Sequence, residues 1–209
     1  PCSSPIFSVL AESNAEWRTA FLLKPIAVRI LHLIDSFGLY GAEKVVLNLV
    51  QQQQRRGWHS VLGSIGGQAD VWRPYELAAV EEGVAVKKFP MRRGFNIVGG
   101  IRIARYAREQ GFQLFHSHGY KGNIIVGLLP RFLRRLPFLT TLHGWRPPHR
   151  LSLWVMQYVE QFSIRRADRV AVVHPELTNH ARLARLSNRI CVIRNGIPDP
   201  PPLPKTVLD

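Results

Sequence analysis

Histidines close several apolar stretches of this sequence. Residues 115–119 (Phe-His-Ser-His-Gly) carry two of them, and residues 140–145 (Thr-Thr-Leu-His-Gly-Trp) carry another. Imidazole titrates near neutral pH and can serve as a general acid or base. We interpret His143 as a candidate for chemistry and His116 as a hydrogen-bonded structural residue, whereas His118 fits either role.

A glycine-containing loop at residues 35–43 (Asp-Ser-Phe-Gly-Leu-Tyr-Gly-Ala-Glu) leads into a helical pattern. Glycine lets the backbone approach a ligand, and a helix start offers unpaired amides and a positive dipole end. A phosphate or diphosphate suits this place, although the loop taken alone also fits a tight turn, with Glu43 as a solvated first-turn residue. Neither G-x-G-x-x-G nor G-x-x-x-x-G-K-[ST] is present.

Alternating strand and helix patterns must position these loops. Apolar runs predict strands at residues 28–34, 59–65, 84–89, 113–116, 138–142, 169–173 and 190–193. Helices are predicted from Ala42 to a stop at Gly57, and at 72–82, 96–110, 122–136 (broken near Pro130) and 150–166. Residues 151, 155, 158, 159 and 162 form one apolar stripe on the last helix.

This alternation predicts an α/β fold, namely a Rossmann-like, doubly wound and mainly parallel sheet of about seven strands with helices on both faces. Ligands bind such sheets at the carboxyl ends of the strands, near the point where the strand order reverses. We divide the chain into an extension of unclear role at 1–25, one domain at 26–197 and a proline-rich linker at 198–209.

The composition is that of an ordinary soluble protein, with 46% hydrophobic and 20% charged residues. No apolar stretch approaches the roughly 18 residues of a membrane span, and no basic residue precedes the first apolar stretch, so we expect a cytoplasmic protein. Cys2 and Cys191 form neither a metal-binding spacing nor a disulfide framework. A net charge of +14 favours anionic partners, including nucleic acid, anionic lipid and phosphorylated small molecules, or else reflects only a solvated surface.

The ordered set of motifs resembles the N-terminal, acceptor-side half of a family-4 GT-B glycosyltransferase. It comprises the Gly-Ala-Glu of the loop, His-Ser-His-Gly, Thr-Leu-His-Gly, Arg-Ala-Asp-Arg-Val at 166–170 and Ile-Arg-Asn-Gly-Ile-Pro-Asp at 193–199. The resemblance covers about residues 28–199. It departs from the family where Tyr40-Gly41 replaces two adjacent glycines, and where His174 replaces a serine.

The resemblance implies a role for particular residues. Gly41, with Ala42 and Glu43 beside it, would lie against the donor diphosphate. His143 would be the catalytic residue near the transferred sugar. The acceptor would contact His118, Gly119 and Trp145, and residues Asn195 and Gly196 would begin the interdomain hinge.

The resemblance also implies an activity: transfer of a hexose-like sugar from a nucleotide sugar to a saccharide or lipid-linked acceptor, as in cell-envelope glycan synthesis. Retention of anomeric configuration is expected, with no metal and no other cofactor. Most donor-binding groups of the family lie in a second lobe, which is missing from this chain. Because transfer needs both substrates oriented together, we expect the fragment alone to be inactive.

Two basic groups suggest peripheral attachment to the inner face of the cell membrane. Lys121, Arg131, Arg134 and Arg135 surround Phe132 and Leu133, and residues 146, 149 and 150 lie near Trp145 and Trp154. The alternative is that these apolar residues are core, which the pattern favours for Trp154.

Two other classes of protein remain in view. The charge fits a basic α/β module that binds nucleic acid or an anionic surface without catalysis, but the basic residues are spread along the chain and form no reader motif. A nicotinamide-dependent enzyme lacks support, because the dinucleotide fingerprint and an acidic residue closing the second strand are both missing.

Overall fold

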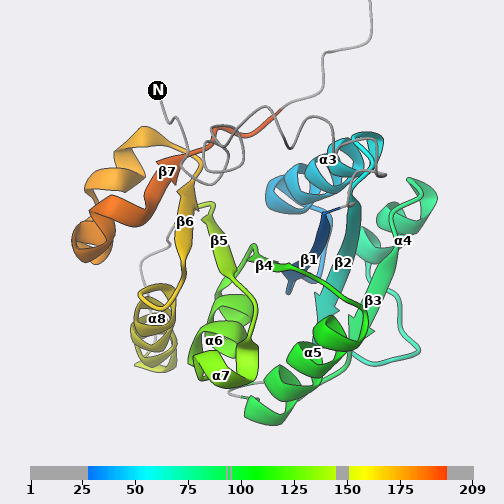
Figure 1. The fold of residues 1–209 in the computed structure, drawn as a ribbon, viewed down its shortest axis with the longest axis horizontal. Helices are drawn as coiled ribbons and strands as arrows, with labels where there is room; N and C mark the ends of the chain where they lie inside the picture. Colours follow the sequence, from blue (N-terminus) through cyan, green and yellow to red (C-terminus); the bar gives the residue numbers. More distant parts are fainter. Residues whose placement is uncertain (1–27, 93, 95, 145–150, 197–209) are drawn as a thin grey trace, which may run out of the picture.

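A parallel seven-stranded sheet forms the centre of the molecule, with strand order β3-β2-β1-β4-β5-β6-β7 (Figure 1). The computed structural model describes residues 28–92, 94, 96–144 and 151–196. Its strands are β1 (Arg29–Ile34), β2 (His59–Ile65), β3 (Val86–Phe89), β4 (Leu114–Ser117), β5 (Phe138–Leu142), β6 (Arg169–Val172) and β7 (Ile190–Val192). Its helices are α3 (Gly41–Arg55), α4 (Pro74–Glu81), α5 (Ile97–Glu109), α6 (Tyr120–Leu128), α7 (Arg131–Arg134) and α8 (Leu151–Ile164), with the 3₁₀ segments η1 (Pro175–Asn179) and η2 (Ala181–Arg189).

The strand order reverses between β1 and β4. From β1 the chain builds outward to β3 on one side, and from β4 it builds outward to β7 on the other. Every pairing is parallel, so all the strands end at the same edge of the sheet. This architecture confirms the predicted Rossmann-like fold and places the ligand-binding crevice of such sheets at the carboxyl ends of β1 and β4.

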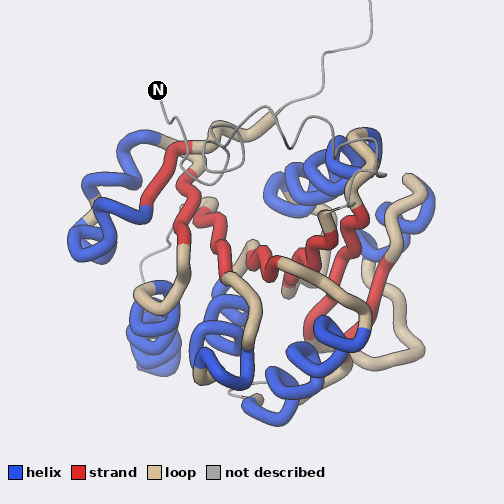
Figure 2. The backbone as a smooth tube through the Cα atoms, in the orientation of Figure 1, coloured by secondary structure: helices blue, strands red, loops and turns tan. Residues whose placement is uncertain are grey.

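Helices cover both faces of the sheet (Figure 2). α3 and α4 pack on one face through a cluster that includes Val46, Leu47 and Tyr75, while α5 and α6 pack on the other through Ile103, Val126 and the strand residues beneath them. Burial on both faces explains why the strands read as continuous apolar runs.

Local signals set most of the element boundaries. The Asn96 side chain accepts a hydrogen bond from the Gly99 amide at 2.7 Å and caps α5 at the start of the helix predicted at 96–110. Gly57 and Gly111 follow α3 and α5 with positive φ angles of 79° and 66°. The helix predicted at 122–136 is two helices, because Pro130 separates α6 from α7.

The apolar stripe of α8 is largely exposed, and so is Trp154, which corrects the interpretation of Trp154 as a core residue. Leu151, Trp154 and Tyr158 are exposed, with Tyr158 at 75%. The helix instead buries Glu160, Ser163 and Ile164. It meets α6 closely, since a Cβ on Gly127 would lie 2.6 Å from the Ser163 carbonyl oxygen. The two helices therefore pack closely through small and polar residues, and the large side chains of α8 point outward.

Among the described residues, no helix combines the length and the apolar character needed to cross a bilayer.

Candidate active site at the carboxyl edge of the sheet

Histidines from three strand segments meet on one face of the sheet. His32 in β1 pairs in register with His116 in β4. His118 lies two residues further on, so its side chain is on the same face as that of His116. His143 directly follows β5, and its ring lies 6.0 Å from the ring of His118. The strand reversal thus gathers residues separated by more than a hundred positions in the sequence.

Hydrogen bonds fix the rings of the inner histidines. His32 Nε2 lies 2.7 Å from Gln53 Oε1 of α3, and its Nδ1 lies 3.0 Å from His118 Nε2. His116 Nε2 lies 2.7 Å from the Thr141 hydroxyl, which matches the structural role predicted for this residue. Nearest-neighbour rings are close throughout, with 4.0 Å between the centroids of His116 and His118.

Burial keeps these histidines neutral. It lowers the pKa of His32 to about 4, with the hydrogen bond to Gln53 opposing the shift. The pKa values of His116 and His118 lie well below the ordinary value, first because of burial and then because of the neighbouring histidines. A charged imidazolium is costly in such a place, so the group works as a set of neutral donors and acceptors.

The first turn of α3 interacts with His143 through the charge of Glu43. Burial lowers the pKa of His143, and the Glu43 carboxylate raises it in part. Glu43 is itself buried and accepts a hydrogen bond from the Tyr40 amide at 2.8 Å, which caps α3. It is therefore not the solvated residue that the sequence suggested. Ala42 is half-buried, while Gly41 is exposed and has open space around its Cα.

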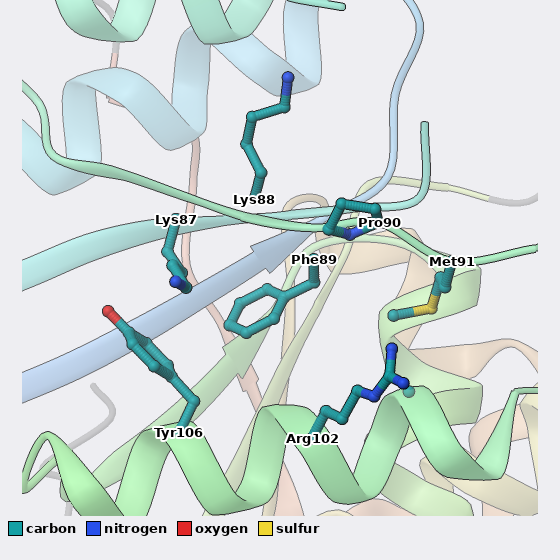
Figure 3. Close-up of a pocket in the computed structure, with 8 residues that line it drawn as sticks. Lys87, Lys88, Phe89, Pro90, Met91, Arg102 and Tyr106 are labelled. Carbon is teal, nitrogen blue, oxygen red and sulfur yellow. The ribbon is translucent and has the colours of Figure 1, made fainter. Parts of the chain in front are cut away.

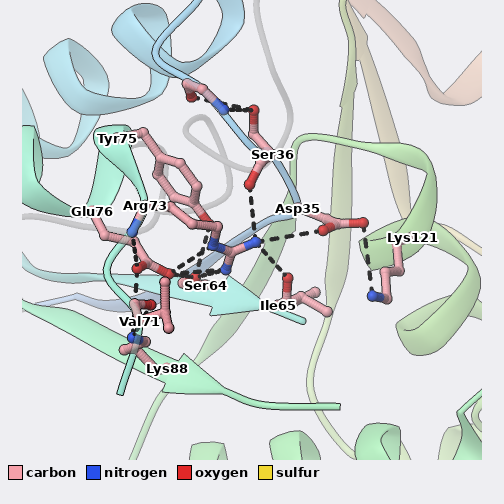
Figure 4. Close-up of polar contacts among 11 residues, drawn as sticks. Asp35, Ser36, Ser64, Ile65, Val71, Arg73, Tyr75, Glu76, Lys88 and Lys121 are labelled. Carbon is pink, nitrogen blue, oxygen red and sulfur yellow. Dashed lines mark hydrogen bonds and ion pairs between the residues drawn. The ribbon is translucent and has the colours of Figure 1, made fainter. Parts of the chain in front are cut away.

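A buried ionic cluster holds the loop that precedes α3 (Figure 4). Arg73 donates to the carbonyl oxygens of Ser36 and Ile65 at 2.9 and 3.1 Å, and it pairs with Glu76 at 2.9 Å. Asp35 lies 3.7 Å from Arg73 and 3.8 Å from Lys121. Burial raises the pKa of Asp35 more than Lys121 and Arg73 lower it. The cluster ties the ends of β1 and β2 to α4 and α6.

The remaining predicted residues are only partly brought together. His118 is buried, and Gly119 is the N-cap of α6 beside it. Asn195 and Gly196 are exposed after β7, at the far end of the sheet. Trp145 lies outside the described residues, as do the basic residues 146, 149 and 150.

Sequence reasoning missed the residues that organise this edge: His32, Gln53, Arg73 and Glu76. A signal existed for His32, since a histidine inside a fully apolar strand needs a partner. Lys121 was expected on a basic surface, but it is buried beside Asp35. Arg134 was expected there too, yet it is 3% exposed and pairs with Asp168 at 3.1 Å.

In the described part of the chain, one set of histidines has ring nitrogens close enough together to hold a metal ion. Ring nitrogens of His32, His116 and His118 lie within 4.8 Å of one another. The sequence predicted no metal, and the hydrogen bond between His32 and His118 occupies two of these nitrogens.

A separate cavity of about 260 Å³ lies between β3 and α5 (Figure 3). Lys87, Arg102, Phe89 and Tyr106 are among its lining residues, and Lys87 Nζ lies 5.0 Å from the centroid of the Tyr106 ring. It contains none of the predicted site residues and is smaller than most small-molecule sites.

Comparisons with known proteins give a family and a fold. The family described as Glycosyltransferase Family 4 matches residues 40–199. HepE from Anabaena, solved in complex with UDP, has a TM-score of 0.64 at 18% identity, covering 81% of this chain and 44% of its own. A glycosyltransferase from Rickettsia africae has a TM-score of 0.56 at 14% identity, covering 83% of this chain and 44% of its own.

A third structure, the UDP-GlcNAc 2-epimerase of Neisseria meningitidis bound to UDP-GlcNAc, has a TM-score of 0.59 at 12% identity and covers 80% of this chain and 47% of its own. The chain thus spans less than half the length of each of these solved proteins. No curated protein matches it.

Replacing Glu43→Gln should lower the pKa of His143 further, because the carboxylate that favours the imidazolium is removed. Glutamine still accepts the Tyr40 amide hydrogen bond, so the cap of α3 is preserved. An NMR titration of the His143 ring measures the effect. Glu109→Gln, which changes an exposed carboxylate paired with Arg105, is the matched control. An unchanged His143 pKa in Glu43→Gln would show that the two groups do not share a site.

Proposed function

The chain belongs to glycosyltransferase family 4, and we propose that it forms the acceptor-side lobe of an enzyme that transfers a sugar from a nucleotide sugar to a saccharide or lipid-linked acceptor. The observation that carries this proposal is that the α3 start follows the carboxyl end of β1, while the ring of His143, after β5, lies 6.0 Å from that of His118, after β4, at the same edge of the sheet. A helix start suits a diphosphate, and a neutral histidine beside it suits contact with sugar hydroxyl groups.

Each residue has a distinct part in this proposal. The backbone at Gly41 and Ala42 receives the diphosphate, because exposed glycine leaves room for close approach. Glu43 faces inward and holds the loop instead of facing the anion, since its carboxylate accepts the Tyr40 amide. His143 contacts the transferred sugar or the acceptor hydroxyl and can move a proton at one ring nitrogen.

A second lobe completes the cleft in the proposed enzyme. The solved relatives are about twice as long as this chain, and HepE was solved with UDP. Charge developing on the leaving diphosphate would be stabilised by positive groups and helix amides, without a metal. Retention of anomeric configuration at the transferred sugar is part of the same proposal.

The acceptor is proposed to reach the site from an anionic membrane surface, through α8. The exposed apolar residues of α8 are Leu151, Leu153, Trp154, Val155, Tyr158 and Phe162. The helix carries no exposed acidic residue, and the exposed Arg165 and Arg166 directly follow it. Phe132 of α7 is also exposed. Helices α7 and α8 lie on the same side of the sheet (Figure 1). Apolar side chains next to arginine suit the interface of an anionic bilayer.

Sugar transfer is tested with the 209-residue chain and with the proposed two-lobed enzyme that contains it (the full polypeptide), using radiolabelled UDP-sugars and a membrane or oligosaccharide extract. We expect negligible transfer by the chain alone. In the full polypeptide, His143→Ala should lower kcat by at least about 100-fold. His59→Ala changes an exposed histidine at the opposite edge of the sheet and should have no effect. Transfer by the chain alone, or full activity in His143→Ala, would overturn the proposal.

Membrane attachment is tested by sedimentation with vesicles containing phosphatidylglycerol. Trp154→Glu should reduce the bound fraction about tenfold, since it removes an apolar side chain worth roughly 1.5–3 kcal/mol on burial and adds a repelled charge. Val80→Glu, an exposed position on the other face of the sheet, is the control. Equal sedimentation with neutral and anionic vesicles would contradict the proposed surface.

A further inference from the structure

Two buried nitrogens on neighbouring histidine rings have no hydrogen-bond partner. They are Nδ1 of His118 and Nε2 of His143, and among the described residues only Arg29 Nε shares this condition. Buried polar atoms in folded proteins are nearly always paired. Two orphaned atoms on adjacent rings therefore call for a common explanation.

The partner of His32 determines where that ring carries its proton. Gln53 Oε1 accepts the Ser60 hydroxyl at 2.6 Å and also lies 2.7 Å from His32 Nε2. An amide oxygen has no hydrogen to give, so His32 Nε2 must donate. A neutral imidazole has one ring proton, and His32 Nδ1 is consequently an acceptor.

The position of the proton on His32 determines the position of the proton on His118, because the two rings share a hydrogen bond. His32 Nδ1 and His118 Nε2 are 3.0 Å apart in rings inclined by only 18°. Because His32 Nδ1 accepts, His118 Nε2 must donate. The orphaned Nδ1 of His118 therefore carries a lone pair and no proton.

We propose that His143 completes this chain by donating its Nε2 proton to His118 Nδ1, directly or through one water. A lone pair and an unpaired ring nitrogen are complementary, and both are buried. The rings of His118 and His143 are 6.0 Å apart, against 5.3 Å for the bonded pair His32 and His118, so a small rotation of His143 closes the bond. Gly144, with φ of 132°, follows His143 and gives the backbone room for that adjustment.

This series of hydrogen bonds makes Gln53 and His32 positioning residues for His143. With its proton held on Nε2, His143 keeps a lone pair on Nδ1, which is the state that can accept a hydrogen bond or proton from a hydroxyl group. This last step rests on the proposed function, whereas the proton arrangement of the four residues stands without it.

The alternative to this hydrogen-bonded arrangement is a metal ion bound to the same ring nitrogens. Binding one at His32, His116 and His118 would need three lone pairs and would remove the proton shared by His32 and His118. The two arrangements therefore differ at a single, measurable proton.

The proposal is tested by ¹⁵N NMR of histidine-labelled protein at neutral pH, which reports which ring nitrogen carries the proton. We expect His118 and His143 both protonated on Nε2, with a coupling between His118 Nε2 and His32 Nδ1 across their hydrogen bond. Gln53→Met removes the acceptor at the far end and should lower the Nε2 preference at His143 about tenfold, the value of one ordinary hydrogen bond.

Gln53→Glu retains the acceptor and should restore the wild-type pattern, while thermal unfolding checks that each variant is folded. A His143 tautomer that is the same in Gln53→Met and wild type would overturn the proposed series of hydrogen bonds, as would a protonated His118 Nδ1. Stoichiometric Co²⁺ binding that abolishes the His32–His118 coupling would instead establish a metal site. Since none of these readouts needs a sugar substrate, their failure leaves the proposed transferase function to its own assay.

Discussion

The register between β1 and β4 is the constraint on which the candidate site depends. It places His32 opposite His116, and strand alternation then brings His118 to the same face. All three inner histidines are buried, so a neutral ring with partners inside the protein is favoured for each. Gln53 is the partner of His32, Thr141 is the partner of His116, and His118 pairs with His32. The Ser60 hydroxyl donates to Gln53, and the helix α3 that carries Gln53 is thereby joined to the sheet at its point of reversal.

A second network holds the other half of the edge. Asp35, Arg73, Glu76 and Lys121 are all buried or nearly so, and they connect the loop before α3 to α4 and α6. Charge pairs of Asp35 thus hold the loop that leads into α3, while Gly41 at the start of that helix remains exposed. Such support beside an exposed glycine fits the proposed role of this loop in binding a diphosphate.

The sequence predicted the fold well because its signals were local and repeated. Apolar runs, the Asn96 cap and the glycine stops each act within a few residues, and all seven predicted strands are present. The site was harder to predict, because its partners come from distant elements. His143 and the α3 start could be named from their places after strands, but the bond from His32 to Gln53 depends on how α3 lies on the sheet. The α8 stripe misled for a related reason: helical periodicity shows that apolar residues share a face but not what that face meets.

Buried, neutral histidines at the strand reversal are the central claim, and the free energy of unfolding between pH 7 and pH 5.5 tests it directly. In the folded state the pKa values of His32, His116 and His118 are lowered, whereas the unfolded chain binds protons near 6.5. The contribution of these neutral histidines to the free energy of unfolding should therefore be fully present above pH 6.5. Below that pH the free energy of unfolding should fall by about 1.4 kcal/mol per pH unit for each histidine that stays neutral in the folded state. A free energy of unfolding that stays constant over this range would show that these imidazoles are solvated or charged, and would contradict the account.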